Sequence, residues 1–238
     1  MKSAIIIGAT SGIGFELAKI FLKNDYQVGL CGRRIELLGG LKKDHKDRVM
    51  TRKVDITAVK QSIKTVNDLI NAMGRVDIFI ISSGTGCINH DLDLTIELDT
   101  VAVNVQGFMA MANIAMKHFE AQGKGHLAAI SSIAAIRGGY ESPSYNASKS
   151  FMSNYLQGLR QRAYKKNIPV ALTDIQPGFV DTAMAKGEGL FWVAPPEKAA
   201  LQIFQALIKR KKHVYVSRRW RLVAWILKII PDFLYQRL

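Results

Sequence analysis

The chain has 238 residues, of which 48% are hydrophobic and 22% charged, a composition that excludes disordered and collagen-like proteins and suits one large globular domain. The net charge of +14 is uneven: residues 209–238 hold nine Lys or Arg and one acid, for +8, so the preceding 208 residues carry only +6. The two cysteines, Cys31 and Cys87, cannot build a disulfide framework and predict a reducing, cytoplasmic location.

The first predicted strand, Lys2–Ile7, is a short β-branched run. Its unbroken apolar part, Ala4–Ile7, is shorter than the roughly 7 to 15 residues of a secretory signal core. No stretch of the sequence reaches the roughly 18 consecutive apolar residues of a membrane span. We therefore expect a buried strand at the N-terminus and no spanning segment.

A glycine-rich turn, G-A-T-S-G-I-G, follows this strand over residues 8–14 and precedes an amphipathic helix. Strand, turn and helix in this order are typical of a dinucleotide-binding site, because small residues let the backbone approach a pyrophosphate that faces the helix N-terminus. The alternative is a tight turn without a ligand. We expect cofactor contacts from Gly8, Ser11, Gly12, Ile13 and Gly14.

The second strand, Gln27–Cys31, ends in a glycine and two arginines. Nucleotide-binding folds often place an acid here to hold the adenosine ribose, but this chain has Arg33 and Arg34 instead. Guanidinium groups bind a 2′-phosphate well, so the pattern favours NADP (NADPH) over NAD. The alternative is two solvated arginines that open a helix.

The third and fourth strands are predicted over Val49–Val54 and Val76–Ser82. Asp55, which precedes Ile56, could accept a hydrogen bond from an adenine amino group or cap the helix that begins near Ala58. After the fourth strand the small residues S-S-G-T-G allow a cofactor to pass close over the sheet, or form a plain loop. We expect further cofactor contacts from Asp55, Ile56, Ser83 and Gly84.

A long apolar helical pattern spans Leu98–Met116, with Asn104 in its interior. Asparagine is a middling helix former whose side chain competes for backbone groups, so a buried one needs a reason. A satisfied core amide and a catalytic residue both remain open for Asn104.

The fifth strand, His126–Ile130, is followed by two serines, Ser131 and Ser132, and then by a helix that starts near Pro143. Tyr145 and Lys149 lie at i and i+4 on one face of that helix. A phenol has an ordinary pKa near about 10, and a neighbouring ammonium favours the phenolate and lowers that value. A serine hydroxyl at the end of the strand could then hold one carbonyl oxygen together with the phenol. Without support elsewhere, the pair would be an ordinary surface tyrosine and lysine.

The sixth strand, Pro169–Ile175, ends in a turn containing Pro177 and Gly178, at the strand end where open α/β sheets bind ligands. Residues 186–196 contain glycines and then apolar side chains, which suits either a lid over a hydrophobic substrate or an aromatic-anchored loop. A helix over 196–208 and a seventh strand over 213–217 follow. This alternation predicts an α/β fold with one doubly wound parallel sheet of about seven strands, in three layers.

With these residues in place, the sequence resembles the short-chain dehydrogenase/reductase family over roughly residues 2–217, which we take as the catalytic domain. The motifs occur in the order of the family: Gly8, Gly12, Gly14; Asp55; Asn104; Ser132; Tyr145, Lys149; Pro177, Gly178, Thr182. Two positions depart from its pattern: Ile7 replaces a threonine, and Ser82–Gly84 replace the N-N-A-G after the fourth strand. These changes affect the cofactor side more than the catalytic set, which is complete.

The resemblance implies a Rossmann-type fold and an NADP(H)-dependent oxidoreductase that transfers a hydride between the nicotinamide and a carbonyl or secondary alcohol. It implies that Tyr145 exchanges the proton and Ser132 orients the substrate oxygen. Lys149 would bind the nicotinamide ribose and lower the pKa of the tyrosine, and Asn104 would support a water relay to Lys149. Further cofactor contacts are implied for Arg33, Pro177, Gly178, Val180 and Thr182.

Residues 218–238 form a separate basic and apolar tail with a helical pattern. Arg218, Arg221 and Lys228 fall close to one helical face, and Trp and Ile side chains surround much of the remainder. This pattern suits a helix in a membrane interface, which would make the protein peripheral to the inner face of a membrane. The alternatives are an interface in a homodimer or homotetramer, common in the family, and packing on the chain's own core.

We expect a small-molecule, apolar carbonyl or alcohol substrate, whereas a nucleic-acid partner and a bound metal find little support. The positive charge is interleaved with Leu and Ile, which argues against nucleic acid, and the scattered histidines and cysteines show no metal-ligand spacing. The rival from another class is a non-catalytic NADPH-binding sensor or a membrane-recruited scaffold, and an intact Asn, Ser, Tyr and Lys set argues against it. Nucleotide-sugar epimerases and dehydratases share the Tyr and Lys chemistry but usually have a larger C-terminal part.

Overall fold

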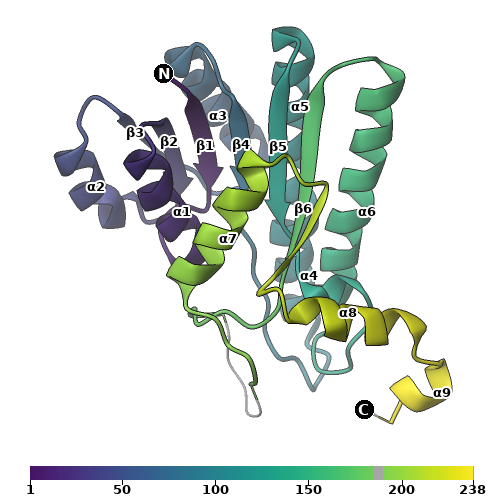
Figure 1. Cartoon of the computed structure of the whole chain (residues 1–238). Helices are drawn as coiled ribbons and strands as arrows, with labels where there is room; N and C mark the ends of the chain where they lie inside the picture. Colours follow the sequence, from purple (N-terminus) through teal and green to yellow (C-terminus); the bar gives the residue numbers. More distant parts are fainter. Residues whose placement is uncertain (185–189, 238) are drawn as a thin grey trace.

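A computed structural model describes residues 1–184 and 190–237. Within these residues, seven parallel strands form one sheet in the order β3-β2-β1-β4-β5-β6-β7 (Figure 1). This order confirms the predicted Rossmann-type doubly wound fold. In sheet order the strands are β3 Val49–Lys53, β2 Gln27–Gly32, β1 Ser3–Ile7, β4 Ile78–Ile81, β5 Gly125–Ile130, β6 Val170–Pro177 and β7 His213–Val216.

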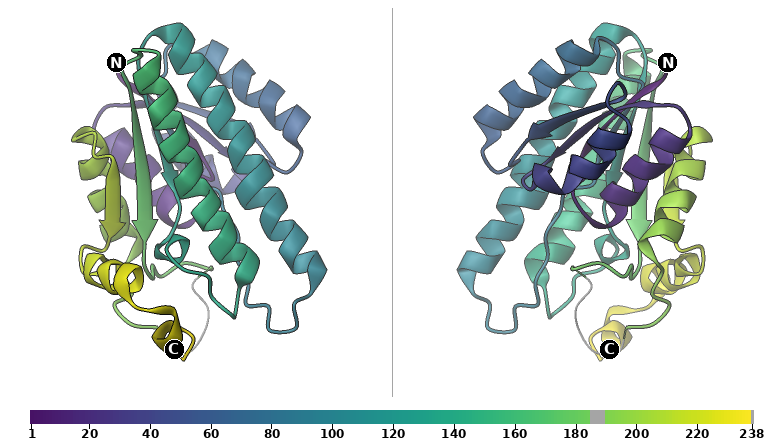
Figure 2. Two further views of the ribbon diagram at one scale, coloured as in Figure 1. Left: turned by 90° about the vertical axis from the view of Figure 1, so that its right-hand side faces the viewer. Right: turned by 90° about the vertical axis from the view of Figure 1, so that its left-hand side faces the viewer.

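Helices cover both faces of the sheet, which gives the three predicted layers (Figure 2). On one face α1 (Gly12–Lys23) packs against α7 (Pro196–Ile208). On the other face lie α3 (Val59–Met73), α5 (Phe108–Gln122) and α6 (Pro143–Lys165). Because both faces are covered, the central strands are continuous apolar runs rather than alternating ones.

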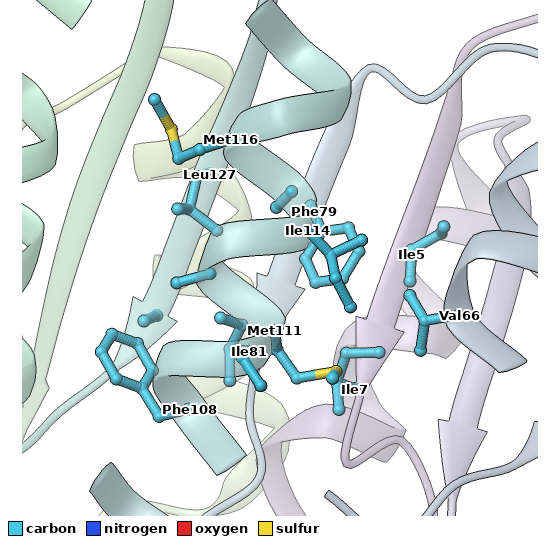
Figure 3. Close-up of a cluster of buried hydrophobic side chains, with 14 of the residues drawn as sticks. Ile5, Ile7, Val66, Phe79, Ile81, Phe108, Met111, Ile114, Met116 and Leu127 are labelled. Atoms are coloured by element: carbon cyan, nitrogen blue, oxygen red, sulfur yellow. The ribbon is translucent and has the colours of Figure 1, made fainter. Parts of the chain in front are cut away.

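The larger hydrophobic core lies between the sheet and helices α3, α5 and α6, with α5 at its centre. Figure 3 shows Ile5, Phe79 and Leu127 of three neighbouring strands facing Met111 and Ile114 of this helix. All five side chains are buried. This packing holds the carboxyl ends of β1, β4 and β5 in fixed positions, and the predicted site residues follow those ends.

The helical pattern predicted over 98–116 is not one regular helix. Helix α4 (Leu94–Val101) passes into a π-helical turn, η2 (Ala102–Gly107), and only then into α5. A π-helical turn accommodates an extra residue, and such turns are frequent at functional sites. Asn104 lies inside η2 and is fully buried. Its side chain forms hydrogen bonds with the loop that follows β4.

The remaining elements are short. The 3-10 turn η1 (Ile35–Leu38) and helix α2 (Gly39–Asp44) follow β2, and the 3-10 turn η3 (Ile133–Ala135) follows β5. At the C-terminus, α8 (Trp220–Ile229) and α9 (Asp232–Tyr235) lie at the end of the sheet to which the strand arrows point (Figures 1 and 2). Across 1–184 and 190–237, no helix combines the length and the apolarity needed to cross a bilayer.

Candidate active site

The glycine-rich turn between β1 and α1 packs tightly on the residues after β4. Gly8 and Gly12 have φ of +89° and +54°, a backbone region that favours glycine. A Cβ added at Gly8 would lie 2.6 Å from the Ser83 amide nitrogen. A Cβ at Gly14 would overlap the Gly8 carbonyl oxygen. The turn therefore brings the predicted contacts Gly8, Gly14 and Ser83 together, and it has no room for a side chain at Gly8 or Gly14.

The N-terminus of α1 is open to an anion. Ser11 occupies the cap position, but its side chain makes no capping hydrogen bond, and the first turn contains no acid. Unpaired N–H groups and the helix dipole favour negative charge at such an end. Together with the glycine turn, these N–H groups fit the pyrophosphate of a dinucleotide.

Arg33 and Arg34 lie exposed at the carboxyl end of β2. The Arg34 guanidinium donates a hydrogen bond to the Ser11 hydroxyl, at 3.2 Å. Arg34 is thus directed toward the glycine turn and not into solvent alone.

Asp55 makes a local turn with Thr57. Its carboxylate accepts hydrogen bonds from the Thr57 amide (3.0 Å) and hydroxyl (2.7 Å). The hydroxyl bond is the main reason that the pKa of Asp55 lies below its ordinary value, and the positive charge of Arg33 adds to the effect. Helix α3 begins only at Val59, so the carboxylate is not the cap of that helix. The adenine contact stays a prediction.

The predicted Tyr-Lys pair lies in the first turns of α6. The helix begins at Pro143, whose missing N–H suits the first helical position, so Tyr145 and Lys149 fall on one face. Lys149 is buried, and its Nζ donates to the carbonyl of Ile130 at the end of β5 (3.1 Å). The same Nζ lies 5.5 Å from the centroid of the Tyr145 ring.

The two serines after β5 point in different directions. Ser131 donates to the Asp174 carboxylate and to the carbonyl of Ile175 (3.1 Å), and it is buried. Ser132 accepts a hydrogen bond from the Ala134 amide (3.1 Å). Hydrogen bonding by the Ser132 hydroxyl also works against the rise in the pKa of the Tyr145 phenol. The geometry favours Ser132 as the partner of the tyrosine.

The pKa values at this centre differ from the expectation that Lys149 acidifies the phenol. Burial raises the pKa of Tyr145, and the Ser132 hydroxyl only partly opposes this. Burial likewise lowers the pKa of Lys149 to about 8, against the opposing charge of Asp174. Desolvation is thus the dominant influence on the pKa of both groups in this structure, and Lys149 Nζ is held by the Ile130 carbonyl.

Asn104 connects η2 to the loop after β4. Its Oδ1 accepts from the Thr85 amide (2.9 Å), and its Nδ2 donates to the Thr85 carbonyl (2.7 Å) and the Ser148 hydroxyl (3.0 Å). A Cβ added at Gly84 would lie 3.0 Å from Lys149 Nζ and 3.4 Å from Asn104 Oδ1. The loop therefore runs directly over the lysine and the asparagine. The predicted water relay stays a prediction.

Of the other predicted cofactor residues, Thr182 faces the glycine turn, and several others are packed in the interior. A Cβ added at Gly12 would lie 3.1 Å from the Thr182 methyl group, so Thr182 faces the glycine turn. Val180 is buried and bridges Ala194, and Ile13 is packed against the core. Ile56 is buried and lies under Gly107 of η2. Of the predicted lid, residues 186–189 lie outside the described residues.

Pro177 ends β6, and Gly178 follows it against the Trp220 ring of α8, with no room for a Cβ. Asp174 of β6 is a further buried group that the sequence interpretation overlooked. It receives bonds from Ser131 and from Gln176 Nε2 (3.0 Å). The signal in the sequence was an acidic residue inside a predicted strand. In the part of the chain that is described, no group of His, Cys, Asp or Glu could hold a metal ion.

Arg137, also overlooked, fastens the C-terminal segment to the loop that carries Ser132. Its guanidinium donates to the carbonyls of Leu227 (2.9 Å) and Ile230, at the end of α8, and pairs with Asp232 at 2.6 Å. The hydroxyl of Tyr235 donates to the carbonyl of Gly138 (2.5 Å). We call this group the Arg137 clasp. Arg137 and its partners are at least 90 residues apart in sequence, so no local sequence pattern could predict the clasp.

Replacing Arg137 with methionine should loosen α8 and α9 without unfolding the domain. The variant keeps the apolar stem but leaves carbonyls unpaired, at a cost of about 1–3 kcal/mol. Amide hydrogen exchange in α8 and α9 should then be about 10- to 100-fold faster. Arg221→Met, on an exposed part of α8, is the control and should exchange at the parent rate. Unchanged exchange in Arg137→Met would show that the clasp does not hold the tail.

The comparisons with known proteins agree with this geometry. The sequence model of the short chain dehydrogenase family matches residues 2–190. An uncharacterised oxidoreductase of Staphylococcus haemolyticus is 35% identical over 188 residues, which cover 78% of this chain and 80% of the relative.

Solved structures show the same fold. A short chain dehydrogenase of Burkholderia cenocepacia in complex with NADP has a TM-score of 0.85 at 22% identity, covering 100% of this chain and 99% of the other. A short chain dehydrogenase/reductase of Burkholderia phymatum in complex with NAD has a TM-score of 0.86 at 17% identity, covering 94% and 92%. The chain therefore belongs to the short chain dehydrogenase family of oxidoreductases.

Proposed function

We propose that the protein is an NADP(H)-dependent oxidoreductase that interconverts a carbonyl and a secondary alcohol on an apolar substrate. The observation that supports it most is the convergence of Tyr145, Ser132 and Lys149 at the carboxyl end of β5, beside the loop over Gly84. The glycine turn and the open N-terminus of α1 lie at the same end of the sheet. A dinucleotide site and an acid–base group thus share one edge of the fold.

The residues divide the chemistry between them. When bound, NADPH supplies the hydride. The Ser132 hydroxyl donates a hydrogen bond to the substrate oxygen, and Tyr145 gives that oxygen its phenolic proton as negative charge develops. The raised pKa of Tyr145 keeps the phenol protonated until then. Lys149 supplies positive charge that favours the resulting phenolate, and Asn104 and Ile130 hold the lysine's surroundings in place.

The preference for NADP rests on Arg33 and Arg34. Both are exposed at the end of β2, Arg34 reaches the glycine turn, and no acid stands at the position where NAD-binding folds hold a ribose. Similar solved structures are bound to NADP or 5-hydroxy-NADP in several cases and to NAD in another, so our proposal of NADP rests on these two side chains.

The double variant R33A/R34A should raise the KM for NADPH at least tenfold and leave the KM for NADH nearly unchanged, because each lost charged hydrogen bond is worth about 1.5–3 kcal/mol. Steady-state kinetics with both nucleotides measure this. The control is Arg75→Ala, an exposed arginine that pairs with Asp77 at the opposite end of the sheet. A parallel loss for NADH and NADPH would contradict recognition of a 2′-phosphate.

The apolar substrate class is supported by the side chains near the site. Phe191, Trp192 and Val193 are exposed, and Phe191 stacks on Trp220 with ring centroids 5.0 Å apart. Measuring NADPH oxidation against carbonyl compounds of increasing chain length tests the proposal. We expect kcat/KM to rise with chain length. Nucleotide binding with no turnover on any carbonyl would instead assign the protein to a non-catalytic NADPH sensor.

A further inference from the structure

Helix α8 has an apolar stripe on each of two opposite faces. Trp220 and Ala224 are buried against the domain. The other face carries Leu222, Trp225, Ile226 and Ile229, which are 60%, 70%, 57% and 78% exposed. These four residues have the i, i+3, i+4, i+7 spacing of a helix face that normally packs in a core. We call them the outer stripe.

Basic side chains border the outer stripe. Arg221 and Lys228 are exposed and lie along one edge of it, and Arg219 is exposed just before the helix. Beyond the helix, Phe233 continues the apolar surface and is 64% exposed. The only acid in residues 209–238, Asp232, is paired with Arg137. The surface is therefore apolar and positively charged.

This surface is held firmly in place. Trp220 packs edge to face on Phe179 at 5.2 Å and on the backbone of Gly178. At the other end of α8, the Arg137 clasp binds the last carbonyls of the helix. These contacts fix both ends of α8, so the outer stripe is held facing away from the domain.

We propose that the outer stripe and its basic border dock on an anionic lipid surface, with α8 lying in the plane of the membrane. The helix has 10 residues, so it can lie in the interface but not cross it. Its apolar side chains would enter the boundary of the acyl chains, and Arg219, Arg221 and Lys228 would meet lipid phosphates.

A second copy of this chain fits the same surface less well. A two-fold interface places the same patch on both partners, so Arg221 and Lys228 of each copy would approach those of the other. Like charges brought together at an interface are unfavourable, and the patch has no free acid to offset them. An anionic lipid surface offers the opposite charge everywhere.

The orientation follows from the place of α8 in the fold. The helix lies at the carboxyl end of the strands (Figure 1). This end carries Tyr145, and the Arg137 clasp joins α8 to the loop of Ser132. Docking would therefore turn the proposed active site toward the membrane. The docking itself requires no catalysis, so its test is independent of the proposed reaction.

The test is flotation of the full chain with vesicles of phosphatidylcholine alone and of phosphatidylcholine mixed in equal parts with phosphatidylglycerol. W225Q/I229Q removes apolar side chains without adding charge, and R221Q/K228Q removes only charge. L201Q/I208Q is the matched control, because Leu201 and Ile208 are exposed apolar residues of α7, far from the outer stripe in sequence. Thermal unfolding confirms that each variant is folded.

We expect the parent chain and the control to float with the anionic vesicles and much less with the neutral ones. The partition coefficient should fall at least tenfold in W225Q/I229Q. R221Q/K228Q should lose the preference for anionic vesicles, and added salt should weaken parent binding. Absence of parent binding, or equal binding by W225Q/I229Q, would overturn the proposal. A dimer that W225Q/I229Q dissociates, without vesicle binding, would assign the surface to a second copy.

Discussion

Replacing Tyr145 with phenylalanine should abolish turnover and leave nucleotide binding intact. The substitution removes one hydroxyl, and the ring can keep its place against the loop at Gly86, where an added Cβ would lie 2.7 Å from the Tyr145 Cε2 atom. Without the phenolic proton, charge on the substrate oxygen is left without its general acid, a loss of about 10²- to 10⁴-fold in kcat. The measurements are NADPH oxidation with the best carbonyl from the chain-length series and NADPH titration by fluorescence.

Tyr164→Phe is the control for Tyr145→Phe. Tyr164 lies on the same helix, α6, but is 84% exposed, so its variant should keep parent kinetics. A Tyr145→Phe enzyme that reduces the carbonyl near the parent rate would mean that another group delivers the proton. A loss of NADPH binding as large as the loss of turnover would point to a structural role for the hydroxyl.

Replacing Gly14 with alanine should weaken nucleotide binding more than tenfold. A Cβ at this position would overlap the Gly8 carbonyl oxygen and lie 3.0 Å from its carbon, so the turn and α1 must separate. Such overpacking costs about 1–3 kcal/mol of stability. It also moves the N–H groups that we expect to face the pyrophosphate, so the Kd for NADPH should rise more than tenfold. Chemical denaturation and NADPH titration measure the two effects.

Gly40→Ala is the matched control for Gly14→Ala. Gly40 lies in α2, has no neighbour within 4 Å of an added Cβ, and should gain about 0.5–1 kcal/mol of stability from the substitution. If Gly14→Ala bound NADPH as well as Gly40→Ala does, the glycine turn would not be the cofactor cradle. The proposed reaction would then need a different nucleotide site.

The sheet could be predicted from the sequence because its strands are buried on both faces. Short apolar runs such as Ile5–Ile7 and Ile78–Ile81 alternate with amphipathic helices along the chain. This pattern is typical of strands in a parallel sheet that is covered on both faces. The pairing of Tyr145 with Lys149 could be predicted equally well, because the start of α6 at Pro143 determines which residues share a face of the helix. These inferences depend only on local spacing.

Features that depend on burial or on distant contacts could not be predicted in the same way. Periodicity indicated a helix around Asn104 but could not show the π-helical turn, because one added residue barely changes the apolar pattern. The choice between Ser131 and Ser132 is made by Asp174, more than 40 residues away. The raised pKa of Tyr145 likewise comes from desolvation, which a sequence does not display.

The π-helical turn around Asn104 also has a consequence for how the protein could be improved. A regular α-helix forms backbone hydrogen bonds with better geometry than a π-helical turn. We therefore expect that changes which convert α4, η2 and α5 into one regular helix would stabilise the protein. Each residue removed from the turn would rotate everything after it by about 100° relative to α4 and take the Asn104 amide away from Thr85 and Ser148. Under the proposed function, thermostability and activity therefore conflict at this turn, and we expect selection for heat resistance alone to erode it.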